Sequence, residues 1–167
     1  AVSALGREFR DRSVDAWLAS AGGSLPRALA GKLAPLGLVY LLLSLGLVAT
    51  FAGWRGWAPA GSPVLWMVAI AVLMIVSVAI AIMLVGLTLN LRRALSVTGF
   101  YVATGLAFSG FSYPRAAMGE VAQWWGGLLP YTHYLPVQQG QWLGGASAGT
   151  WAHGMVPLLA FMAVPLL

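Results

Sequence analysis

The stretch GLAFSGFSYPRAAMGEVAQWWGGLLPYTHYL, residues 105–135, decides how the whole chain is interpreted. It is apolar enough for a membrane, but Pro114 and Pro130 interrupt it, and proline removes an amide donor and restricts the residue before it. Two helical segments of ~15 residues each rise only about 22 Å, less than the ~30 Å hydrocarbon core of a bilayer. Because lipid cannot pair with broken backbone, we predict that residues 114–145 form a re-entrant or interfacial helical hairpin.

The pattern inside this stretch also predicts where its helices begin and end. The entering helix is expected to continue to Phe111 and to stop before the sequence Ser112-Tyr113-Pro114. A second helix is expected over residues 115–129, where apolar side chains recur at spacings of three and four. Pro130 is expected to stop that helix.

The composition is that of an integral membrane protein. The 167 residues are 60% hydrophobic and 8% charged, whereas a soluble domain carries about three times that charged fraction. The chain has no cysteine, which excludes a disulfide framework and a thiolate nucleophile. The net charge of +5 does not indicate nucleic-acid binding, because the arginines lie beside apolar runs and form no clustered basic face.

Residues 1–22 are the only charge-rich stretch, and we predict one amphipathic helix there. Arg7 with Asp11, and Glu8 with Arg12, fall at the i,i+4 spacing of pairs on a solvated helix face. Such a helix is either a plain surface element or a docking element for a partner. Since the chain begins without methionine or a signal pattern, we expect it to be a fragment of a longer protein.

Four apolar runs predict an all-α, polytopic, multi-pass membrane helix bundle. The predicted spans are residues 33–52, 64–89, 95–111 and 151–167. Basic residues then set the orientation of the bundle. Those expected on one side are Arg7, Arg10, Arg12, Arg27, Lys32, Arg92 and Arg93, and those on the other are Arg55 and Arg115. The amino-terminal helix is therefore predicted to be cytoplasmic, and the hairpin to face outward.

No motif predicts catalysis, a metal site or a cofactor. Gly31-Lys32 lacks the earlier glycine and the following Ser or Thr of a phosphate-binding loop, so the chain is not expected to hydrolyse ATP by itself. His133 and His153 lie twenty residues apart and form no i,i+4 metal pair. Glu120 is the only acidic residue after the amino-terminal stretch; it is either functional at membrane depth or exposed at the lipid interface.

Four short motifs occur in order along nearly the whole chain. They are Arg7-Glu8 within GREFRDRSVDAWLAS, Gly31-Lys32, Gly110-Phe-Ser-Tyr-Pro114 with Met118, and Leu129-Pro130-Tyr131-Thr132-His133. In these motifs the chain resembles the carboxy-terminal half of a type-2 ABC transporter permease, the membrane subunit of many bacterial exporters. It departs from that family at Arg12-Ser13, where Gly-Thr is usual, and at Gly119, where proline is common.

The resemblance implies a division of labour. Residues 1–25 would be a cytoplasmic coupling helix that contacts a separate ABC ATPase subunit, and residues 26–167 would be the transmembrane permease domain. Coupling is expected to use Arg7, Glu8, Arg10 and Arg12. The external gate is expected to include Gly110, Tyr113, Pro114, Met118, Glu120, Pro130 and His133.

The same resemblance implies a bacterial inner-membrane location among membrane lipids and a second permease subunit, identical or different. A full permease of this kind has about six spans, so this piece alone is not expected to transport. The alternative interpretation is a passive channel or membrane scaffold protein without an ATPase partner, which would share the amphipathic helix, spans and hairpin. An intramembrane enzyme would need a paired acid and base that the sequence does not show. The sequence does not indicate the substrate.

Overall fold

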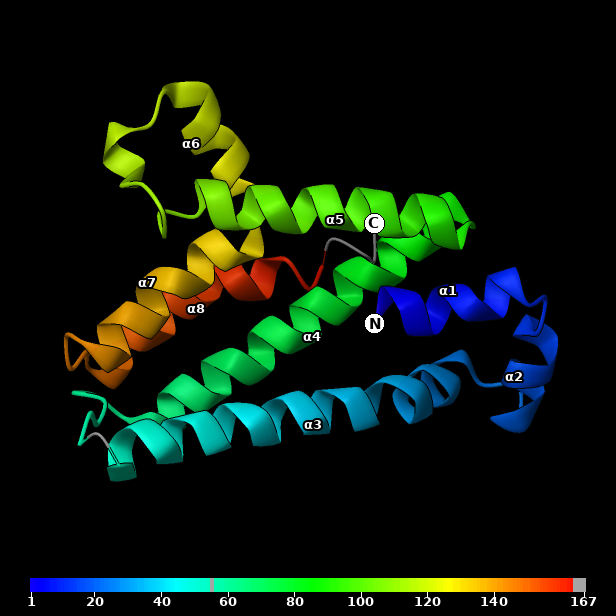
Figure 1. The fold of residues 1–167 in the computed structure, drawn as a ribbon, viewed down its shortest axis with the longest axis horizontal. Coiled ribbons are helices and arrows are strands. Elements are labelled where there is room, and N and C mark those ends of the chain that lie inside the picture. The colour runs from blue at the N-terminus through cyan, green and yellow to red at the C-terminus, as the bar shows by residue number, and fades with distance from the viewer. Residues whose placement is uncertain (55, 164–167) are drawn as a thin grey trace.

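In the computed structural model, residues 1–54 and 56–163 are described, and within these ranges the chain is all-helical with no strand. The prediction of an all-α fold is confirmed. The elements are α1 (Val2–Arg10), α2 (Val14–Ser20), α3 (Leu25–Trp54), α4 (Pro63–Thr88), α5 (Leu91–Phe108), the 3₁₀ turn η1 (Arg115–Ala117), α6 (Glu120–Gly127), α7 (Pro130–Trp142) and α8 (Ala148–Ala160). The long helices α3, α4 and α5 run along the molecule; α1 and α2 lie toward one end, and η1 and α6 at the other (Figure 1).

Two helices of the described chain, α3 and α4, are long and apolar enough to cross a membrane. Over a stretch of 18 residues the mean hydropathy is 2.1 in α3 and 3.2 in α4. The bounds of α4 agree within one residue with the predicted 64–89. Ser62 begins α4 by accepting a hydrogen bond from the Leu65 amide at 3.4 Å, and Leu89 ends it in the left-handed region at φ 45°.

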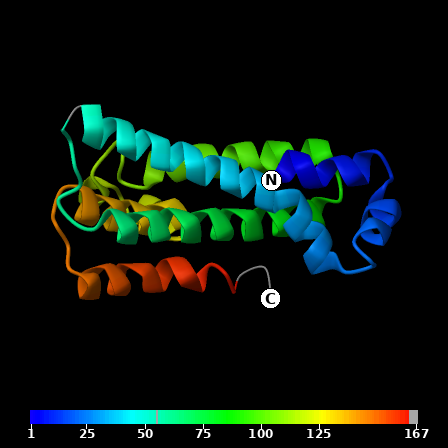
Figure 2. The same ribbon diagram turned by 90° about the horizontal axis from the view of Figure 1, so that it is seen from below.

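Helix α3 is longer than the predicted span 33–52, because it begins at Leu25. The Ser24 carbonyl accepts from the Ala28 amide at 3.0 Å, and Pro26 falls in the first turn, where proline costs little. Pro35 therefore lies inside the helix instead of near its start. A proline at such a position removes one helical hydrogen bond, which explains the bend in the first third of α3 (Figure 2).

Helix α5 begins and ends earlier than the predicted span 95–111. The Asn90 side chain accepts from the amides of Arg92 and Arg93 at 3.0 and 3.3 Å and so begins the helix at Leu91. The helix ends at Phe108, and Gly110 follows with φ +95°, a conformation that glycine adopts at little cost. The 18 residues of α5 rise about 27 Å.

The predicted single helix over residues 115–129 is wrong. The short turn η1 is followed by extended backbone at Met118 (ψ 148°) and Gly119 (ψ 158°), and α6 starts only at Glu120. Glycine is a poor helix former, so the apolar periodicity across this point does not produce a continuous helix. Pro130, predicted to stop a helix, is the first residue of α7, a position where its missing amide costs nothing.

The last predicted span also differs from the structure. Helix α8 has 13 residues and ends at Ala160, and Pro157 lies inside it. At about 20 Å, α7 and α8 are each shorter than the hydrocarbon core. Residues 164–167, which the predicted span 151–167 includes, lie outside the described part of the chain. The crossing by this segment and the re-entrant course of residues 114–145 therefore stay predictions.

Helix α4 is the central helix, because both hydrophobic clusters are built on it. One cluster joins α4 to α7 and α8 and consists of Ala69, Val76, Ile80, Tyr134, Val137, Met155 and Leu158. The other joins α4 to α1, α3 and α5 and consists of Val2, Leu5, Leu33, Ala81, Val85 and Ala94. Gly154 permits the close contact of α8 with α7, since a Cβ there would lie 2.7 Å from Val137 Cγ2.

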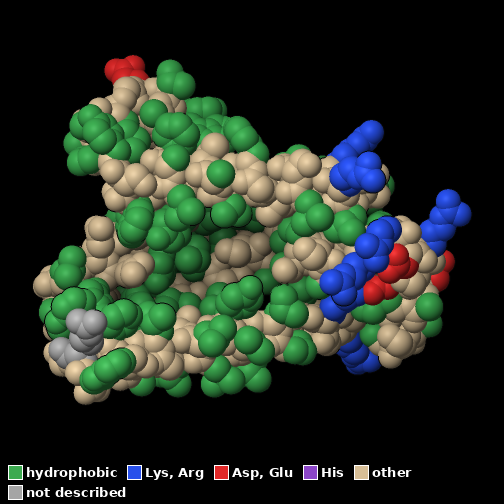
Figure 3. Space-filling view, viewed as in Figure 1, with side chains coloured by type: hydrophobic (Ala, Val, Ile, Leu, Met, Phe, Trp, Pro, Cys, Tyr) green, Lys and Arg blue, Asp and Glu red, His purple; other side chains and the backbone are tan. Residues whose placement is uncertain are grey.

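Helix α3 exposes large apolar side chains around its circumference. They are Leu36, Leu38, Val39, Tyr40, Leu42, Leu43, Leu45 and Leu47, each 40–63% exposed. An uninterrupted apolar surface of this kind is unfavourable in water but matches the hydrocarbon of a bilayer or a partner helix. Apolar side chains are also spread along the helices on the face shown in Figure 3, away from the charged groups at one end.

Candidate functional site

Charged side chains gather at one end of the bundle, where α1 and α2 lie (Figure 3). Seven of the nine basic residues belong to α1, the α1–α2 link, the first turns of α3 or the first turn of α5. They are Arg7, Arg10, Arg12, Arg27, Lys32, Arg92 and Arg93. Arg115 lies in η1 at the other end, and Arg55 is outside the described residues. We call the end of the bundle that holds these seven residues the charged end, and the end with η1 and α6 the outer end.

The amino-terminal stretch forms two helices, so the predicted single amphipathic helix is wrong. Helix α1 ends at Arg10, and α2 begins only at Val14, because Arg12 has a left-handed backbone with φ 53°. The predicted i,i+4 register between Glu8 and Arg12 is lost at this break. Asp11 accepts from its neighbour Arg10 instead, at 2.8 Å from Nε, and this hydrogen bond lowers the pKa of Asp11.

Glu8 connects three elements at the charged end. One carboxylate oxygen pairs with Lys32 Nζ of α3, and the other accepts from the Ser13 hydroxyl at 2.5 Å. Lys32 Nζ also lies 5.1 Å from the centre of the Trp17 ring in α2, a favourable cation–π arrangement. The hydrogen bonds from Lys32 first, and from Ser13 second, hold the pKa of Glu8 below its ordinary value of 4.5.

Helix α1 is held in the bundle by buried residues, whereas α2 packs on it only through partly buried side chains such as Trp17. Val2, Leu5 and Gly6 of α1 are buried, and a Cβ on Gly6 would lie 2.5 Å from Leu91 Cδ1 of α5. Helix α2 has no buried residue. The apolar face of α1 is thus committed to α4 and α5, while its polar face and α2 are presented outward.

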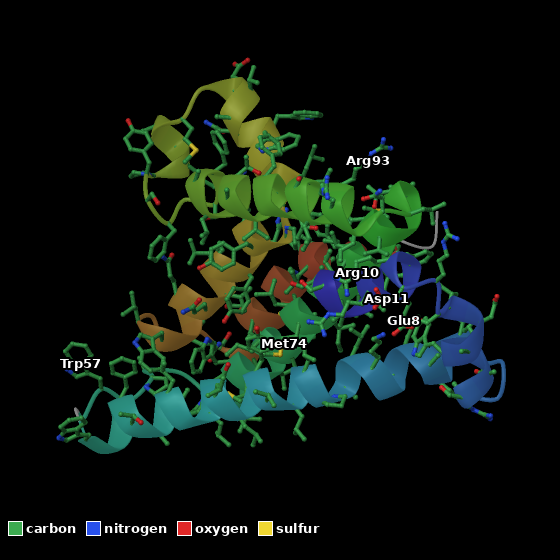
Figure 4. All side chains as sticks on the ribbon, turned by 45° about the vertical axis from the view of Figure 1, so that its right-hand side comes forward. Glu8, Arg10, Asp11, Trp57, Met74 and Arg93 are labelled. Carbon is green, nitrogen blue, oxygen red and sulfur yellow. The ribbon has the colours of Figure 1, made fainter. Side chains whose placement is uncertain are left out.

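A basic crevice opens between α1 and the α4–α5 turn. Its volume is about 680 Å³, and Arg10, Arg92 and Arg93 line it together with Phe9, Leu89, Asn90, Leu91 and Leu95. Figure 4 shows Glu8, Arg10 and Asp11 together at this end of the molecule. No carboxylate of the described residues lines the crevice, so it favours acidic groups of a partner surface.

The residues expected to form the external gate lie at the outer end but do not meet at one point. Tyr113, Pro114 and Glu120 are exposed, and Met118 is half-buried. Glu120 and His133 line different cavities. Glu120 is the first residue of α6, where a carboxylate interacts favourably with the positive end of the helix dipole.

Three of the remaining gate residues join elements at the outer end. Gly110 lies against Arg115, since a Cβ on it would be 3.1 Å from Arg115 Cγ. Pro130 is buried at the start of α7. His133 Nε2 donates to the Gly127 carbonyl at 2.9 Å and so links α7 to the end of α6.

Sequence reasoning missed Lys32 as the partner of Glu8 and missed Gln141 altogether. Gln141 is fully buried; its Oε1 accepts from the Ser62 amide at 2.8 Å, and its Nε2 donates to the Ala146 carbonyl at 2.9 Å. It therefore ties the α3–α4 loop to the α7–α8 turn. Three glutamines, Gln138, Gln139 and Gln141, stand close together in this segment, and nothing in the sequence distinguishes the one that is buried.

A family model described as ABC-2 family transporter protein matches residues 1–166. The chain belongs to this family. It matches no curated protein and no solved structure. This ABC-2 chain is therefore a transmembrane permease component of a transporter and not itself the catalytic part. Within residues 1–54 and 56–163, no three His, Asp, Glu or Cys side chains come together as a metal site requires.

Proposed function

We propose that this chain is the permease subunit of an ATP-driven ABC exporter in the bacterial inner membrane, and that its charged end binds a separate ATPase subunit. The observation that supports this most directly is the contrast between α1, whose apolar face is buried on α4 and α5, and α2, which has no buried residue. A helix pair that is anchored through α1 and packed only through partly buried side chains in α2 suits transmission of a displacement from a partner.

Two contacts at the charged end can transmit a displacement of α1 and α2 to the bundle. Through Glu8 and Lys32, a displacement of the α1–α2 link reaches the first turns of α3. Through Gly6 and Leu91, a displacement of α1 reaches the start of α5. Closure of an ATPase pair would then bias the bundle between inward-open and outward-open states, a two-state mechanism.

The charge distribution supports a cytoplasmic location for the charged end, because short cytoplasmic loops carry an excess of Lys and Arg. In this orientation α3 and α4 cross the membrane as a hairpin, and α5 returns outward. Residues 114–145 would enter the membrane from outside and leave on the same side, because α6 and α7 are each too short to cross. The outer end would then be the external gate.

A second permease subunit, identical or different, would complete the pathway between two bundles. Helix α5 also exposes large apolar side chains, among them Phe100 at 63% and Val102 at 55%. A translocation path enclosed by two copies of such helices needs part of this surface at the subunit interface, and lipid covers the rest.

The test is a charge reversal at the charged end of the full-length permease, expressed together with its neighbouring genes so that a partner ATPase can copurify. Arg7→Glu with Arg12→Glu reverses two exposed charges that take part in neither hydrophobic cluster. We expect loss of copurification with the ATPase. Glu8→Gln, which loosens the tie to Lys32, should keep copurification but uncouple ATP hydrolysis from export.

Arg27→Glu is the control, because it reverses one exposed charge of the charged end that lies in α3 and not in α1, α2 or the link between them, which carry the proposed docking. It should leave copurification intact. Equal loss in the control and in the double variant would show a general electrostatic effect and contradict docking through α1 and α2. Absence of any copurifying ATPase would favour the passive channel or scaffold instead.

A further inference from the structure

A cavity of about 280 Å³ lies at the outer end, between η1 and the paired helices α7 and α8. Its walls are partly apolar, and its polar lining residues are Arg115, Thr132, His133, Gln141, Thr150 and Trp151. No aspartate or glutamate of the described residues lines it. The cavity is separate from the charged end and from the crevice beside α1.

Three of the lining residues hold buried polar atoms without a hydrogen-bond partner among the described residues. The atoms are Arg115 Nε, Thr132 Oγ1 and Trp151 Nε1. Thr132 is only 1% exposed, so bulk water does not reach its side chain. A buried donor left unpaired costs about 1–3 kcal/mol, and three such atoms on one cavity call for an explanation.

The other polar side chains of the cavity are already paired. Gln141 uses both ends of its amide, and His133 Nε2 donates to Gly127. Thr150 Oγ1 lies 3.1 Å from the Ser147 hydroxyl. The three buried unpaired atoms therefore remain available to a ligand.

The chemistry of these groups decides which ligand fits. Arginine Nε and tryptophan Nε1 can only donate hydrogen bonds, and arginine stays positively charged. The Arg115 guanidinium is held in place, because its Nη2 donates to the Gln123 carbonyl at 3.2 Å and Gly110 leaves room for its side chain. We propose that this cavity binds an anionic phosphate group, with Arg115 as its charge partner and Thr132 and Trp151 as further donors.

The phosphate has two possible sources, the headgroup of a phospholipid or free inorganic phosphate. Both present several acceptor oxygens to a donor-lined site. The inference does not depend on an ATPase partner, because none of its residues belongs to the charged end.

The experiment uses the full-length permease purified in a phosphate-free glycoside detergent. Binding of short-chain phosphatidylglycerol, of inorganic phosphate and of a phosphate-free diacylglycerol with the same acyl chains is measured by calorimetry. We expect the phosphate-bearing lipid to bind more tightly than the diacylglycerol. Arg115→Gln should weaken that binding about tenfold, which corresponds to ~1.4 kcal/mol.

Two further variants keep the test independent of folding. Thr132→Val removes only the hydroxyl and keeps the shape, so it should weaken binding several-fold without lowering the unfolding temperature. Arg115→Lys keeps the charge and should bind better than Arg115→Gln. Arg27→Gln, an arginine of the charged end, is the control and should bind as the parent does.

Each outcome decides for or against the site. Binding of both lipid and inorganic phosphate, weakened by Arg115→Gln, establishes a phosphate site open to either source. Binding of the lipid alone, with the same dependence, assigns the site to a headgroup. Equal binding of the diacylglycerol, no binding of either phosphate ligand, or affinities unchanged in both Arg115→Gln and Thr132→Val would overturn the proposal.

Discussion

The two ends of the molecule both place polar groups beside an apolar helix bundle, but they pair these groups differently. At the charged end, the carboxylate of Glu8 is fully engaged by Lys32 and Ser13, and the remaining charges point outward. At the outer end, charges are few, and polar groups are buried inside the fold. Gln141 is paired on both sides there, while Arg115 and Thr132 each keep an unpaired atom.

This difference separates a surface that is built for a protein partner from a pocket that is built for a small polar group. Exposed, mixed charges on anchored helices give contact and orientation without a large desolvation cost. Buried donors cost free energy unless something pairs with them, so they are kept only where a contact uses them. The predictions that follow alter one end at a time.

The largest expected effect is at Gln141. Gln141→Leu keeps the size of the side chain but leaves the Ser62 amide and the Ala146 carbonyl without their partner. We expect a loss of about 2–4 kcal/mol of stability, at ~1–2 kcal/mol for each of the two partly buried groups left unpaired, the lower part of the usual range. Thermal unfolding in detergent measures it. Gln139→Leu, an exposed residue of the same helix, is the control; equal effects of the two changes would mean that the outer end is not held by Gln141.

A smaller effect is expected where α1 packs on α5. Gly6→Ala places a Cβ against Leu91 and should destabilise the fold by about 1–3 kcal/mol, the usual cost of overpacking. Gly31→Ala, where nothing lies within 4 Å, should be neutral or stabilising because alanine favours helix. If Gly6→Ala is as stable as Gly31→Ala, then α1 does not pack tightly on α5. The proposed transmission of movement from the charged end to the bundle would then lack its anchor.

The smallest expected effect concerns the tie between Glu8 and Lys32. Glu8→Gln should cost about 1 kcal/mol, since the pair is close to the surface. The pKa of Glu8 is lowered in the folded protein, so the stabilisation is complete above its ordinary value of 4.5 and is lost as the pH falls further through the folded pKa. Unfolding temperatures measured between pH 7 and pH 3 should therefore converge for the parent and Glu8→Gln at the acid end. If the difference in unfolding temperature between the parent and Glu8→Gln stays constant with pH, the ion pair is contradicted.

The long apolar helices could be predicted from the sequence, but the contacts that make the sites could not. The uncharged apolar run predicts the bounds of α4 within one residue, because both the burial and the length of this helix follow from its apolar composition. The break between α1 and α2 has no glycine or proline to mark it, since Arg12 itself adopts the positive φ. The pairs Glu8–Lys32 and Ser62–Gln141 join residues that are 24 and 79 positions apart in the sequence. The spacing of apolar residues along one helix gives no information on contacts at such separations.

The most direct test of the account determines on which side of the membrane three positions lie. Because the chain has no cysteine, Arg12→Cys, Ser112→Cys and Leu143→Cys each introduce a single thiol for a membrane-impermeant maleimide. We predict that cysteines at 112 and 143 react from outside intact cells, and that a cysteine at 12 reacts only after permeabilisation. Labelling of 112 and 143 from opposite sides would show that the intervening segment crosses the membrane. Labelling of 12 and 112 from the same side would contradict the cytoplasmic charged end and, with it, the ATPase docking.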